Sequence, residues 1–510
     1  MNKSTLIWLK RSLYFLIFWG VFYFSVGYFK YFSLPPMGVH QSAQCDRASL
    51  AQNYFYNGFN FFYPEVNENR CEDGIVSCEL PIISYCAAIS YRLFGYDEFW
   101  FRLITFFVFT VGIFALFNWI KNYSNSLISY VLIVLLCSSP ILLFYANSFL
   151  PDIPSFGLIL IAFYLFFKLH IKHAYLPNSN SFILKVVFIL CLGLSVAIKT
   201  TSLVHWLTLT SLLVFSNIKP LNIIIISKKE LAFQLCFAIL IPITWYLWSR
   251  QLAINHNADY FLMQLPEWTN WSNYKDAWLI YLNNWPDQTF VLPLFYIVTF
   301  GLVVQFFLFK KSISHLWFLS VINTLGAFSF LTIMMFQFRY HDYYIITLFP
   351  TFVLNWIYIL AYLSTLNKSF VYFKVAILVL LIIGANYHYN FGKKNLTERY
   401  TFGNYWEQSH QNPSDYIMFK NKIQSINISR NDCVLVGYDI SPNNILYYLH
   451  LRGYRFYSDQ SEEKLSSIIG NAQLKYIISN EETFEGQVKK YVGLKFLKSY
   501  KNIKLFQIIR

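Results

Sequence analysis

Apolar runs long enough to cross a membrane recur through most of this chain, and they constrain its fold more than any other feature. A helix needs ~20 mostly apolar residues to span the hydrocarbon core of a bilayer. The sequence therefore predicts a mainly α-helical, polytopic membrane protein with about 11 transmembrane helices. The expected spans are 12–32, 99–119, 127–147, 154–169, 182–198, 202–217, 231–249, 289–309, 316–336, 343–363 and 370–387.

The composition agrees with a membrane protein and argues against a nucleic-acid-binding one. Apolar residues make up 56% of the chain and charged residues only 13%, which is typical of membrane proteins. The net charge of +14 would by itself suit a nucleic-acid partner. Before residue 387, however, the lysines and arginines mostly flank the apolar runs, as charges that set membrane topology do. We therefore expect membrane lipids as partners, and no nucleic acid.

The positive-inside rule gives the orientation of the spans. With the N-terminus inside, the inner connections carry many lysines and essentially one acid, Glu230. The outer connections carry almost every acid, so the long loop 34–98 and, after an odd number of crossings, the C-terminus face outward. The inner lysines are Lys121, Lys168, Lys172, Lys219, Lys228, Lys229, Lys310, Lys311, Lys368 and Lys374, and the outer acids of the later connections are Asp152, Asp259, Glu267, Asp276, Asp287 and Asp342.

The chain divides by composition into two predicted domains. Residues 1–389 form a membrane domain with loop 34–98 as its longest outer connection, and residues 390–510 contain no run long enough to cross a membrane. Strand patterns alternate with helical patterns after residue 390, which predicts a small α/β domain. The expected strands are 432–438, 474–478, 494–497 and 503–509, and the expected helices are 442–451 and 462–469.

Acids are concentrated in loop 34–98, and Asp46 is the one that we single out there. It follows the first span closely, so we expect it near the outer face of the membrane. A carboxylate at that position could take a proton from an acceptor hydroxyl or amine; a solvated acid or a partner of Arg47 are the alternatives. Glu79 lies at the end of the same loop, where it could line a substrate cavity or favour the N-terminus of a helix expected at 82–91.

Two more ionisable residues lie at short outer turns between apolar segments. Asp152 is flanked by Pro151 and Pro154, and an ionisable group at the lip of a helix bundle is a functional candidate. Capping of the next helix is the alternative for this acid. Lys199 lies on the outer side, where the positive-inside rule disfavours a lysine, and this makes it a second functional candidate. The alternative is that its side chain only extends to the membrane interface.

A third outer turn carries Arg339 and, after it, His341, Tyr343 and Tyr344. Cationic groups and tyrosine hydroxyls at one membrane face suit a phosphate group. Pairing with Asp342 is the alternative for the arginine. We place His341 in the possible substrate cavity. The alternative is that His341 only forms hydrogen bonds within its own loop.

The cysteines of the first loop give no evidence of a metal site. Cys45, Cys71 and Cys78 lie in this loop and Cys86 lies just beyond it, without a Cys-x-x-Cys pair or a histidine partner. We therefore expect no resident cofactor, and the sequence leaves a divalent metal open. A disulfide within the group, for example Cys71 with Cys78, is expected if the loop faces an oxidising compartment, but the spacing does not give the connectivity.

Four short motifs follow one another at the expected outer turns. They are Asp46 in the first outer loop; Glu79-Leu80-Pro81, then a helix ending in Phe94-Gly95, then Glu98 and Arg102-Leu103; Asp152-Ile153-Pro154; and His341-Asp342-Tyr343-Tyr344 followed by Leu348-Phe349-Pro350. In this order they resemble the motifs of the GT-C fold glycosyltransferases, specifically the bacterial relatives of protein O-mannosyltransferases and lipid A aminoarabinose transferases. In the second motif many relatives have Lys or His after the glutamate, where this chain has Leu80, so a phosphate or substrate contact is missing there.

The resemblance implies an inverting transfer of a hexosyl or pentosyl group from a polyprenyl-phosphate donor. The acceptor would be a lipid, a glycan or a protein at the periplasmic face of a bacterial inner membrane, with a cytoplasmic N-terminus and a periplasmic C-terminal domain. A polytopic transporter or lipid flippase of cell-envelope glycan assembly is the alternative, but it would favour ionisable groups at mid-membrane. The implied site has Asp46 as the catalytic base and Asp152 assisting it in the same cavity. Lys199, Arg339, Tyr343 and Tyr344 would lie around the donor phosphate.

Overall fold

The computed structural model describes residues 3–171, 181–216, 227–257, 271–366, 371–401, 412–439 and 441–510. Within them the chain forms two compact units, which are described one at a time. Unit 1 comprises Met1–Phe32, Arg102–Leu247 and Met263–Glu398, and unit 2 comprises Ser33–Phe101, Trp248–Leu262 and Arg399–Arg510. The first outer loop is thus grouped with the C-terminal residues, whereas the division by composition joined it to the membrane domain. Of the charged residues used for the topology, Lys172, Lys219, Lys368, Asp259 and Glu267 lie outside the described residues.

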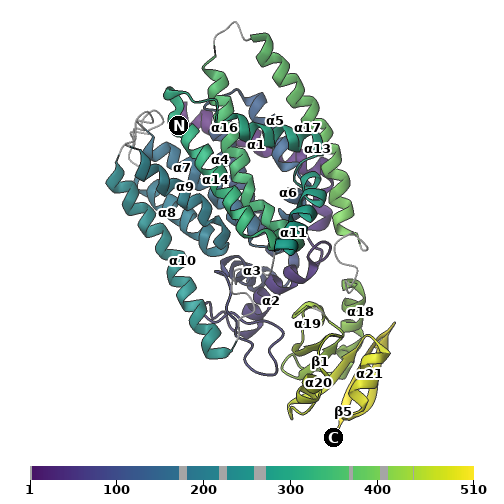
Figure 1. Ribbon diagram of the computed structural model, residues 1–510. Helices are drawn as coiled ribbons and strands as arrows, with labels where there is room; N and C mark the ends of the chain where they lie inside the picture. The colour runs from purple at the N-terminus through teal and green to yellow at the C-terminus, as the bar shows by residue number, and fades with distance from the viewer. Residues whose placement is uncertain are drawn as a thin grey trace. The chain divides into compact units, whose positions relative to one another are not determined.

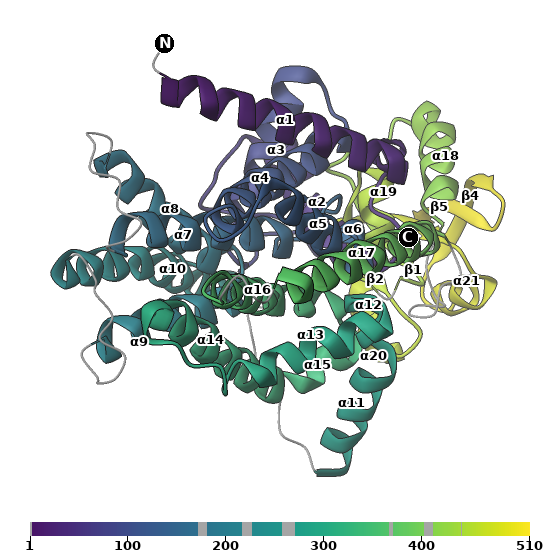
Figure 2. The same ribbon diagram turned by 90° about the horizontal axis from the view of Figure 1, so that it is seen from above.

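Unit 1 is a bundle of helices, several of which run side by side in Figures 1 and 2. Its α-helices are α1 (Lys3–Val26), α4 (Glu98–Ile120), α5 (Ser126–Cys137), α6 (Pro140–Tyr145), α7 (Asp152–His170), α8 (Ser181–Ile198), α9 (Leu203–Phe215), α10 (Lys228–His256), α11 (Trp271–Asn284), α12 (Pro286–Thr289), α13 (Leu292–Val304), α14 (Ser314–Ile333), α15 (Met335–Tyr340), α16 (Phe349–Ser364) and α17 (Val371–Tyr400). Short 3-10 helices are η1 (Tyr28–Tyr31), η3 (Thr200–Ser202), η4 (Lys311–Ile313) and η5 (Asp342–Leu348).

Seven helices in the described part of the chain are long and apolar enough to cross a bilayer, and shorter apolar helices accompany them. Every span expected from the sequence contains at least one helix, so the chain is a multi-pass membrane protein, as predicted. The expected run 127–147 is divided into α5 and α6. The division falls at Pro140, which has no backbone N–H to continue a helix and begins α6 instead.

Small residues bring α4 and α7 close together. A Cβ atom added to Gly112 would lie only 2.6 Å from the Cα atom of Gly157, so the two backbones are in direct contact there. Close approach at small residues is a usual way for membrane helices to pack, because lipid removes the hydrophobic drive between them. The contact fixes the helix whose first residue is Asp152.

Unit 2 combines two N-terminal helices with a C-terminal α/β region. The sheet has the order β2-β1-β3-β5-β4, with β1 parallel to both of its neighbours and β5 antiparallel to both of its own. Strand β1 is buried along its whole length, as is usual for a parallel strand covered on both faces. The elements are α2 (Gln41–Asn57), α3 (Ile82–Phe94), α18 (Pro413–Ile423), η7 (Gln424–Ile426), β1 (Cys433–Gly437), α19 (Asn444–Leu449), β2 (Arg452–Phe456), α20 (Glu462–Ile469), β3 (Leu474–Ser479), α21 (Glu482–Lys489), β4 (Gly493–Tyr500) and β5 (Ile503–Ile509).

The predicted strands and helices of the C-terminal region are confirmed, but α2, α18, η7, β2 and α21 of this unit were not predicted. Strand β2 has the sequence Arg-Gly-Tyr-Arg-Phe and shows no apolar run. Helix α21 is short and mostly polar. Helix α2 lies in a segment that the sequence analysis treated as a loop, because its buried residues include glutamines and asparagines in place of an apolar stripe.

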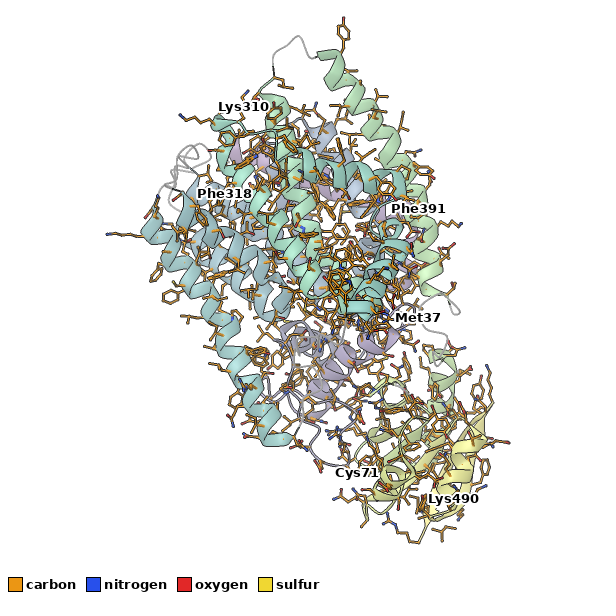
Figure 3. The ribbon with its side chains drawn as sticks, viewed as in Figure 1. Met37, Cys71, Lys310, Phe318, Phe391 and Lys490 are labelled. Carbon is orange, nitrogen blue, oxygen red and sulfur yellow. A yellow bond between two sulfur atoms is a disulfide. The ribbon has the colours of Figure 1, made fainter. Side chains whose placement is uncertain are left out.

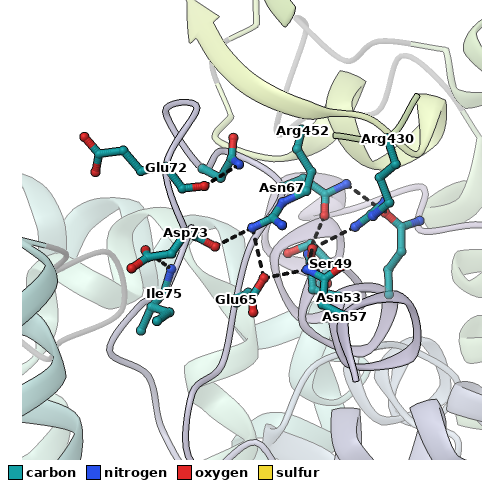
Figure 4. A network of polar contacts seen from close by, with 12 residues as sticks. Ser49, Asn53, Asn57, Glu65, Asn67, Glu72, Asp73, Ile75, Arg430 and Arg452 are labelled. Atoms are coloured by element: carbon teal, nitrogen blue, oxygen red, sulfur yellow. Dashed lines mark hydrogen bonds and ion pairs between the residues drawn. The ribbon is translucent and has the colours of Figure 1, made fainter. Parts of the chain in front are cut away.

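A polar network explains why residues of the first outer loop belong to the same unit as the C-terminal strands. The side-chain nitrogen of Asn53 donates to the Asn67 side-chain oxygen at 2.7 Å, and Arg430 donates to the side-chain oxygen of Asn53 at 2.7 Å (Figure 4). Arg452 of β2 forms an ion pair with Glu65 at 2.9 Å. Buried polar groups must find partners, and here the partners come from residues more than 370 positions apart.

A disulfide joins the same two parts of unit 2. Cys71, labelled in Figure 3, is bonded to Cys433 of β1. The expected pairing of Cys71 with Cys78 is therefore wrong. Cys45, Cys78 and Cys86 form no disulfide within the described part of the chain, and the first two are buried. The sequence could not give this pairing, since the two bonded cysteines are 362 positions apart.

Candidate active site

A buried ion pair occupies the turn between α8 and α9 in unit 1. Helix α8 ends at Ile198, and Lys199 follows in an extended conformation, with its backbone N–H donated to the Ser195 carbonyl oxygen at 3.1 Å. The ammonium nitrogen of Lys199 lies 3.0 Å from a carboxylate oxygen of Asp152. The two residues are only 5% and 3% exposed. Charges buried this deeply are costly unless they are paired.

Asp152 is the first residue of α7, and its surroundings join three segments. The N-cap position belongs to Pro151, so the alternative that Asp152 caps the helix is wrong. The Ser155 hydroxyl donates to the Ser195 carbonyl oxygen at 2.8 Å and lies 2.7 Å from the Ser202 hydroxyl. These contacts tie the start of α7 to the end of α8 and to η3, where the lysine sits.

Two tyrosine rings lie beside the ammonium group of Lys199. Its nitrogen is 4.5 Å from the ring centroid of Tyr344 and 5.1 Å from that of Tyr343. The two rings stack on each other at 5.1 Å. Such positions allow an attraction between the cation and the ring faces. The lysine therefore points into a carboxylate and aromatic environment.

A second buried acid adjoins the tyrosines. The hydroxyl of Tyr145, the last residue of α6, donates to a carboxylate oxygen of Asp342 at 2.5 Å. The rings of Tyr145 and Tyr343 meet edge to face at 6.1 Å. The sequence analysis missed Tyr145, which lies inside an expected apolar span; the break at Ser138-Ser139-Pro140 was the available signal that this run ends in a short turn. Tyr145 and Asp342 are both fully buried.

Arg339 and His341 each pack against tyrosine rings, and their places in a phosphate site and a substrate cavity stay predictions. The guanidinium of Arg339 lies over the ring of Tyr340 at 5.0 Å, and Asp342 accepts a hydrogen bond from Tyr145, so the alternative of an Arg339–Asp342 pair is not found among the described residues. The ring of His341 packs against that of Tyr343 at 5.3 Å. The structure thus brings together five predicted residues of unit 1: Asp152, Lys199, His341, Tyr343 and Tyr344.

Asp46 lies in unit 2, on α2, and is half-buried. The side-chain amide of Asn443 donates to it at 2.8 Å. The amide has this orientation because its oxygen accepts the backbone N–H groups of Asn67 and Glu68 at 3.0 and 3.1 Å. Burial raises the pKa of the Asp46 carboxyl from its ordinary 3.8 to about 6, against the opposing effects of the Asn443 hydrogen bond and the charge of Arg47.

Arg47 pairs elsewhere, and this leaves Asp46 with a neutral hydrogen-bond donor. The guanidinium of Arg47 contacts the carboxylate of Glu79 at 2.5 Å. The alternative that Asp46 is a solvated loop acid is wrong, since it lies on a packed helix. The possible place of Glu79 in a substrate cavity, and the sharing of one cavity by Asp46 and Asp152, stay predictions.

A further carboxyl with a displaced pKa lies near α19. Asp439 is buried and accepts the backbone N–H groups of Ser441 and Ile445 at 3.0 and 2.8 Å. Burial raises the pKa of this carboxyl to about 7. Its hydrogen bonds are those of a residue that shapes the turn into α19, and the sequence analysis did not single it out. In the described part of the chain, no group of three or more His, Cys, Asp and Glu side chains is arranged to hold a metal ion.

Comparison with known proteins identifies the fold through structure alone. No protein-family model matches the sequence, and no curated protein matches it either. The crystal structure of ArnT from Cupriavidus metallidurans bound to undecaprenyl phosphate is 12% identical, with a TM-score of 0.63 over 99% of this chain and 98% of that chain. The apo state of the same protein gives 0.54 at 11% identity, over 96% and 97% of the two chains.

A third solved structure is less similar. The oligosaccharyltransferase of Archaeoglobus fulgidus in complex with zinc and sulfate aligns at a TM-score of 0.47 and 12% identity, over 91% of this chain and 68% of that chain. ArnT is a lipid A aminoarabinose transferase of the GT-C fold, and the alignment with it covers nearly the full length of both proteins. The chain described above therefore has the GT-C fold of membrane glycosyltransferases.

Proposed function

We propose that this protein is a membrane glycosyltransferase that takes its sugar from a polyprenyl-phosphate-linked donor. The observation that carries the proposal is the buried Lys199–Asp152 pair beside the stacked rings of Tyr343 and Tyr344. A lysine buried among membrane helices is costly to keep. Binding of an anionic substrate would explain why the protein keeps a lysine at this position.

The chemistry of this cluster suits a phosphate held at the end of a lipid. An ammonium group donates up to three hydrogen bonds and is a common point-charge ligand for phosphate. Asp152 keeps the lysine charged and in place when no phosphate is near. The apolar helices around the turn suit the hydrocarbon chain of the same lipid. The structural neighbour that spans the full chain was solved bound to undecaprenyl phosphate, which supports this choice of substrate.

We assign the role of general base to Asp46. A catalytic base works best when its pKa lies near the working pH, and the pKa of this carboxyl is raised to about 6. The base would remove the proton from an acceptor hydroxyl or amine. The freed electron pair forms the new bond to the anomeric carbon, and the bond between that carbon and the phosphate oxygen breaks, which releases polyprenyl phosphate. A donor bearing a hexosyl or pentosyl group and a lipid, glycan or protein acceptor fit this reaction.

Unit 2 is proposed to face the periplasm of a bacterium, with the N-terminus of the chain in the cytoplasm. The distribution of lysines and acids supports this orientation in a bacterial inner membrane. The Cys71–Cys433 disulfide supports it independently, because disulfides persist in oxidising compartments such as the periplasm. Labelling of engineered cysteines near residues 121 and 311 from the periplasmic side would contradict the orientation.

Binding of undecaprenyl phosphate to the full chain in detergent tests the proposal. Lys199→Met should weaken binding at least tenfold, because it removes the charge that faces the phosphate. Lys185→Met is a matched control, since Lys185 lies near the other end of α8 and pairs with Glu230 at 2.5 Å. Equal affinity of the wild-type protein and the Lys199→Met variant would contradict the proposed phosphate site.

A further inference from the structure

A hydrogen-bonded group of polar side chains lies inside the helix bundle of unit 1, apart from the cluster around Lys199. Its members sit on α9, α14, α16 and the 3-10 helices η3 and η5, and all are buried. Polar side chains are expensive among membrane helices unless every group finds a partner. The members are Thr201, His205, Thr208, Asn323, Thr347 and Thr351.

The partners of His205 and Asn323 fix where each proton lies. Nε2 of His205 is 3.1 Å from the Thr347 carbonyl oxygen, which can only accept, so this nitrogen carries the hydrogen. Nδ1 of the same ring then accepts from the Asn323 amide nitrogen at 3.0 Å. The second amide hydrogen goes to Thr208 at 2.8 Å, and the Asn323 oxygen accepts from Thr351 at 2.7 Å. The protons of His205 and Asn323 are therefore fixed, whereas either hydroxyl of the Thr201–Thr347 pair can be the donor.

This group ends at the two turns that carry the candidate phosphate ligands. Thr347 lies on η5, three residues after Tyr344, and its hydroxyl is 2.7 Å from that of Thr201 on η3. Thr201 in turn lies two residues after Lys199. A continuous set of hydrogen bonds therefore runs from the middle of α14, through His205 and Thr347, to the turn that holds the lysine.

We propose that His205, Asn323 and Thr347 are positioning residues of the phosphate site. They hold the 3-10 helix that carries Tyr343 and Tyr344 against the turn that carries Lys199. This inference rests on the proposed function and adds to it the residues that set the geometry of the site. A 3-10 helix has poorer internal hydrogen bonds than an α-helix, so the placement of η5 depends on bonds to its neighbours. None of the three positioning residues needs to touch the substrate.

Paired variants separate the hydrogen bonds from the packing. Thr347→Val keeps the shape of the side chain and removes the hydroxyl, whereas Thr347→Ser keeps the hydroxyl. His205→Phe removes both ring hydrogen bonds, whereas His205→Gln keeps an amide N–H for the Thr347 carbonyl oxygen. The dissociation constant of undecaprenyl phosphate, measured on the full chain, should rise by about tenfold in Thr347→Val and in His205→Phe. It should rise less than about twofold in Thr347→Ser and by an intermediate factor in His205→Gln.

A control variant of the same kind lies elsewhere in the bundle. His170 of α7 is also buried and lies 2.9 Å from the side-chain oxygen of Gln234, but its bonds do not reach η3 or η5. His170→Phe should leave the dissociation constant within about twofold of the wild-type value. The thermal unfolding temperature is measured for each variant, so that a lost fold is not counted as lost affinity. If His205→Phe does not fold, the two Thr347 variants decide the question.

The outcomes distinguish this inference from the proposed function on which it rests. Weaker binding in Thr347→Val with rescue in Thr347→Ser supports the inference. Unchanged binding in a folded Thr347→Val protein overturns it, and so does an equal loss in both Thr347 variants. If those results appear while Lys199→Met still loses binding, the proposed phosphate site stands without its positioning residues. If Lys199→Met binds as the wild type does, the phosphate site itself is wrong.

Discussion

Asp152 and Asp46 are two packed carboxylates that the protein holds in different ways. Asp152 in unit 1 faces the ammonium group of Lys199 at 3.0 Å, and both residues are almost fully buried. Asp46 in unit 2 is half-buried and receives a hydrogen bond from the neutral amide of Asn443 at 2.8 Å. A cation thus balances the first acid, and a neutral amide donates to the second.

The difference in partner assigns a different task to each acid. A carboxylate that neutralises a buried lysine keeps that lysine charged and in place, so we expect it to act on binding. A carboxylate held by an amide, with a pKa of about 6, stays able to accept a proton near neutral pH. The resemblance implied Asp46 as the base, with Asp152 assisting it in the same cavity. From their different partners we propose that Asp152 is a positioning acid and Asp46 the base, and the predictions below test that division.

The largest expected effect is on the rate after Asp46→Asn. Loss of a general base should slow sugar transfer by roughly 10²–10⁴-fold, with little change in the affinity for undecaprenyl phosphate. The assay uses membranes supplied with a polyprenyl-phosphate-linked sugar at matched protein levels. Asp415→Asn is the control, because Asp415 is an acid of unit 2 that pairs with the exposed Lys501 at 2.7 Å. Sugar transfer at the wild-type rate in Asp46→Asn would show that Asp46 is not the general base.

A slightly smaller effect is expected on stability when the ion pair of unit 1 is broken. Lys199→Met leaves Asp152 as an uncompensated buried charge, which should lower the free energy of unfolding by about 3–5 kcal/mol. The double variant Lys199→Met with Asp152→Asn should recover most of this loss. Lys185 and its partner Glu230 are each about one-third exposed. Lys185→Met should therefore lower the free energy of unfolding by less than about 1 kcal/mol. A double variant no more stable than Lys199→Met would contradict the pairing.

The pH dependence of transfer should follow the pKa of Asp46. Burial raises this pKa from 3.8 to about 6, and the base is active only when deprotonated. The rate should therefore be level above about pH 7 and fall about tenfold per pH unit below pH 6. An unshifted carboxyl would give a rate that stays level down to pH 5. Initial rates between pH 4.5 and 8 distinguish these two curves.

The smallest effect is expected from the amide that holds the base. The hydrogen bond from Asn443 stabilises the charged form of Asp46, so Asn443→Ala should raise the pKa of the carboxyl by about one unit. The acid limb of the pH–rate curve should move upward by the same amount. Asn444→Ala is the neighbouring control, since Asn444 donates to Ser42 of α2 at 3.2 Å. Equal curves for the two variants would show that Asn443 does not act on Asp46.

The parts of the fold that the sequence predicted are those with a strong local pattern. Long apolar runs predicted the membrane helices, and short apolar runs predicted strands such as β1 and β3. Strand β2 was not predicted because its residues, Arg452–Phe456, mix charged and apolar side chains and show no strand pattern. Its hydrogen bonds to β1, which the local sequence does not reveal, stabilise it as a strand. Helix α2 was read as a loop because the face that it buries is polar, with partners on distant segments.

The candidate site was predictable in its residue types and less so in its contacts. Position alone singled out Lys199 and Asp152, because ionisable residues at turns of apolar helices are unusual. That they pair with each other depends on how α7 and η3 meet, which is set by contacts such as Ser155 with Ser202. Tyr145 was missed because it lies within an apolar run, where the break at Ser138-Ser139-Pro140 was the available signal. The Cys71–Cys433 bond likewise depends on the folded arrangement of unit 2.

A side-by-side measurement of rate and affinity in Asp46→Asn and Asp152→Asn tests the division of roles most directly. For Asp46→Asn the account predicts a rate at least about 100-fold lower and an unchanged dissociation constant for undecaprenyl phosphate. For Asp152→Asn it predicts a dissociation constant about tenfold higher, because Lys199 loses the carboxylate that keeps it charged and in place. Wild-type transfer in Asp46→Asn, or unchanged affinity in a folded Asp152→Asn protein, would contradict it.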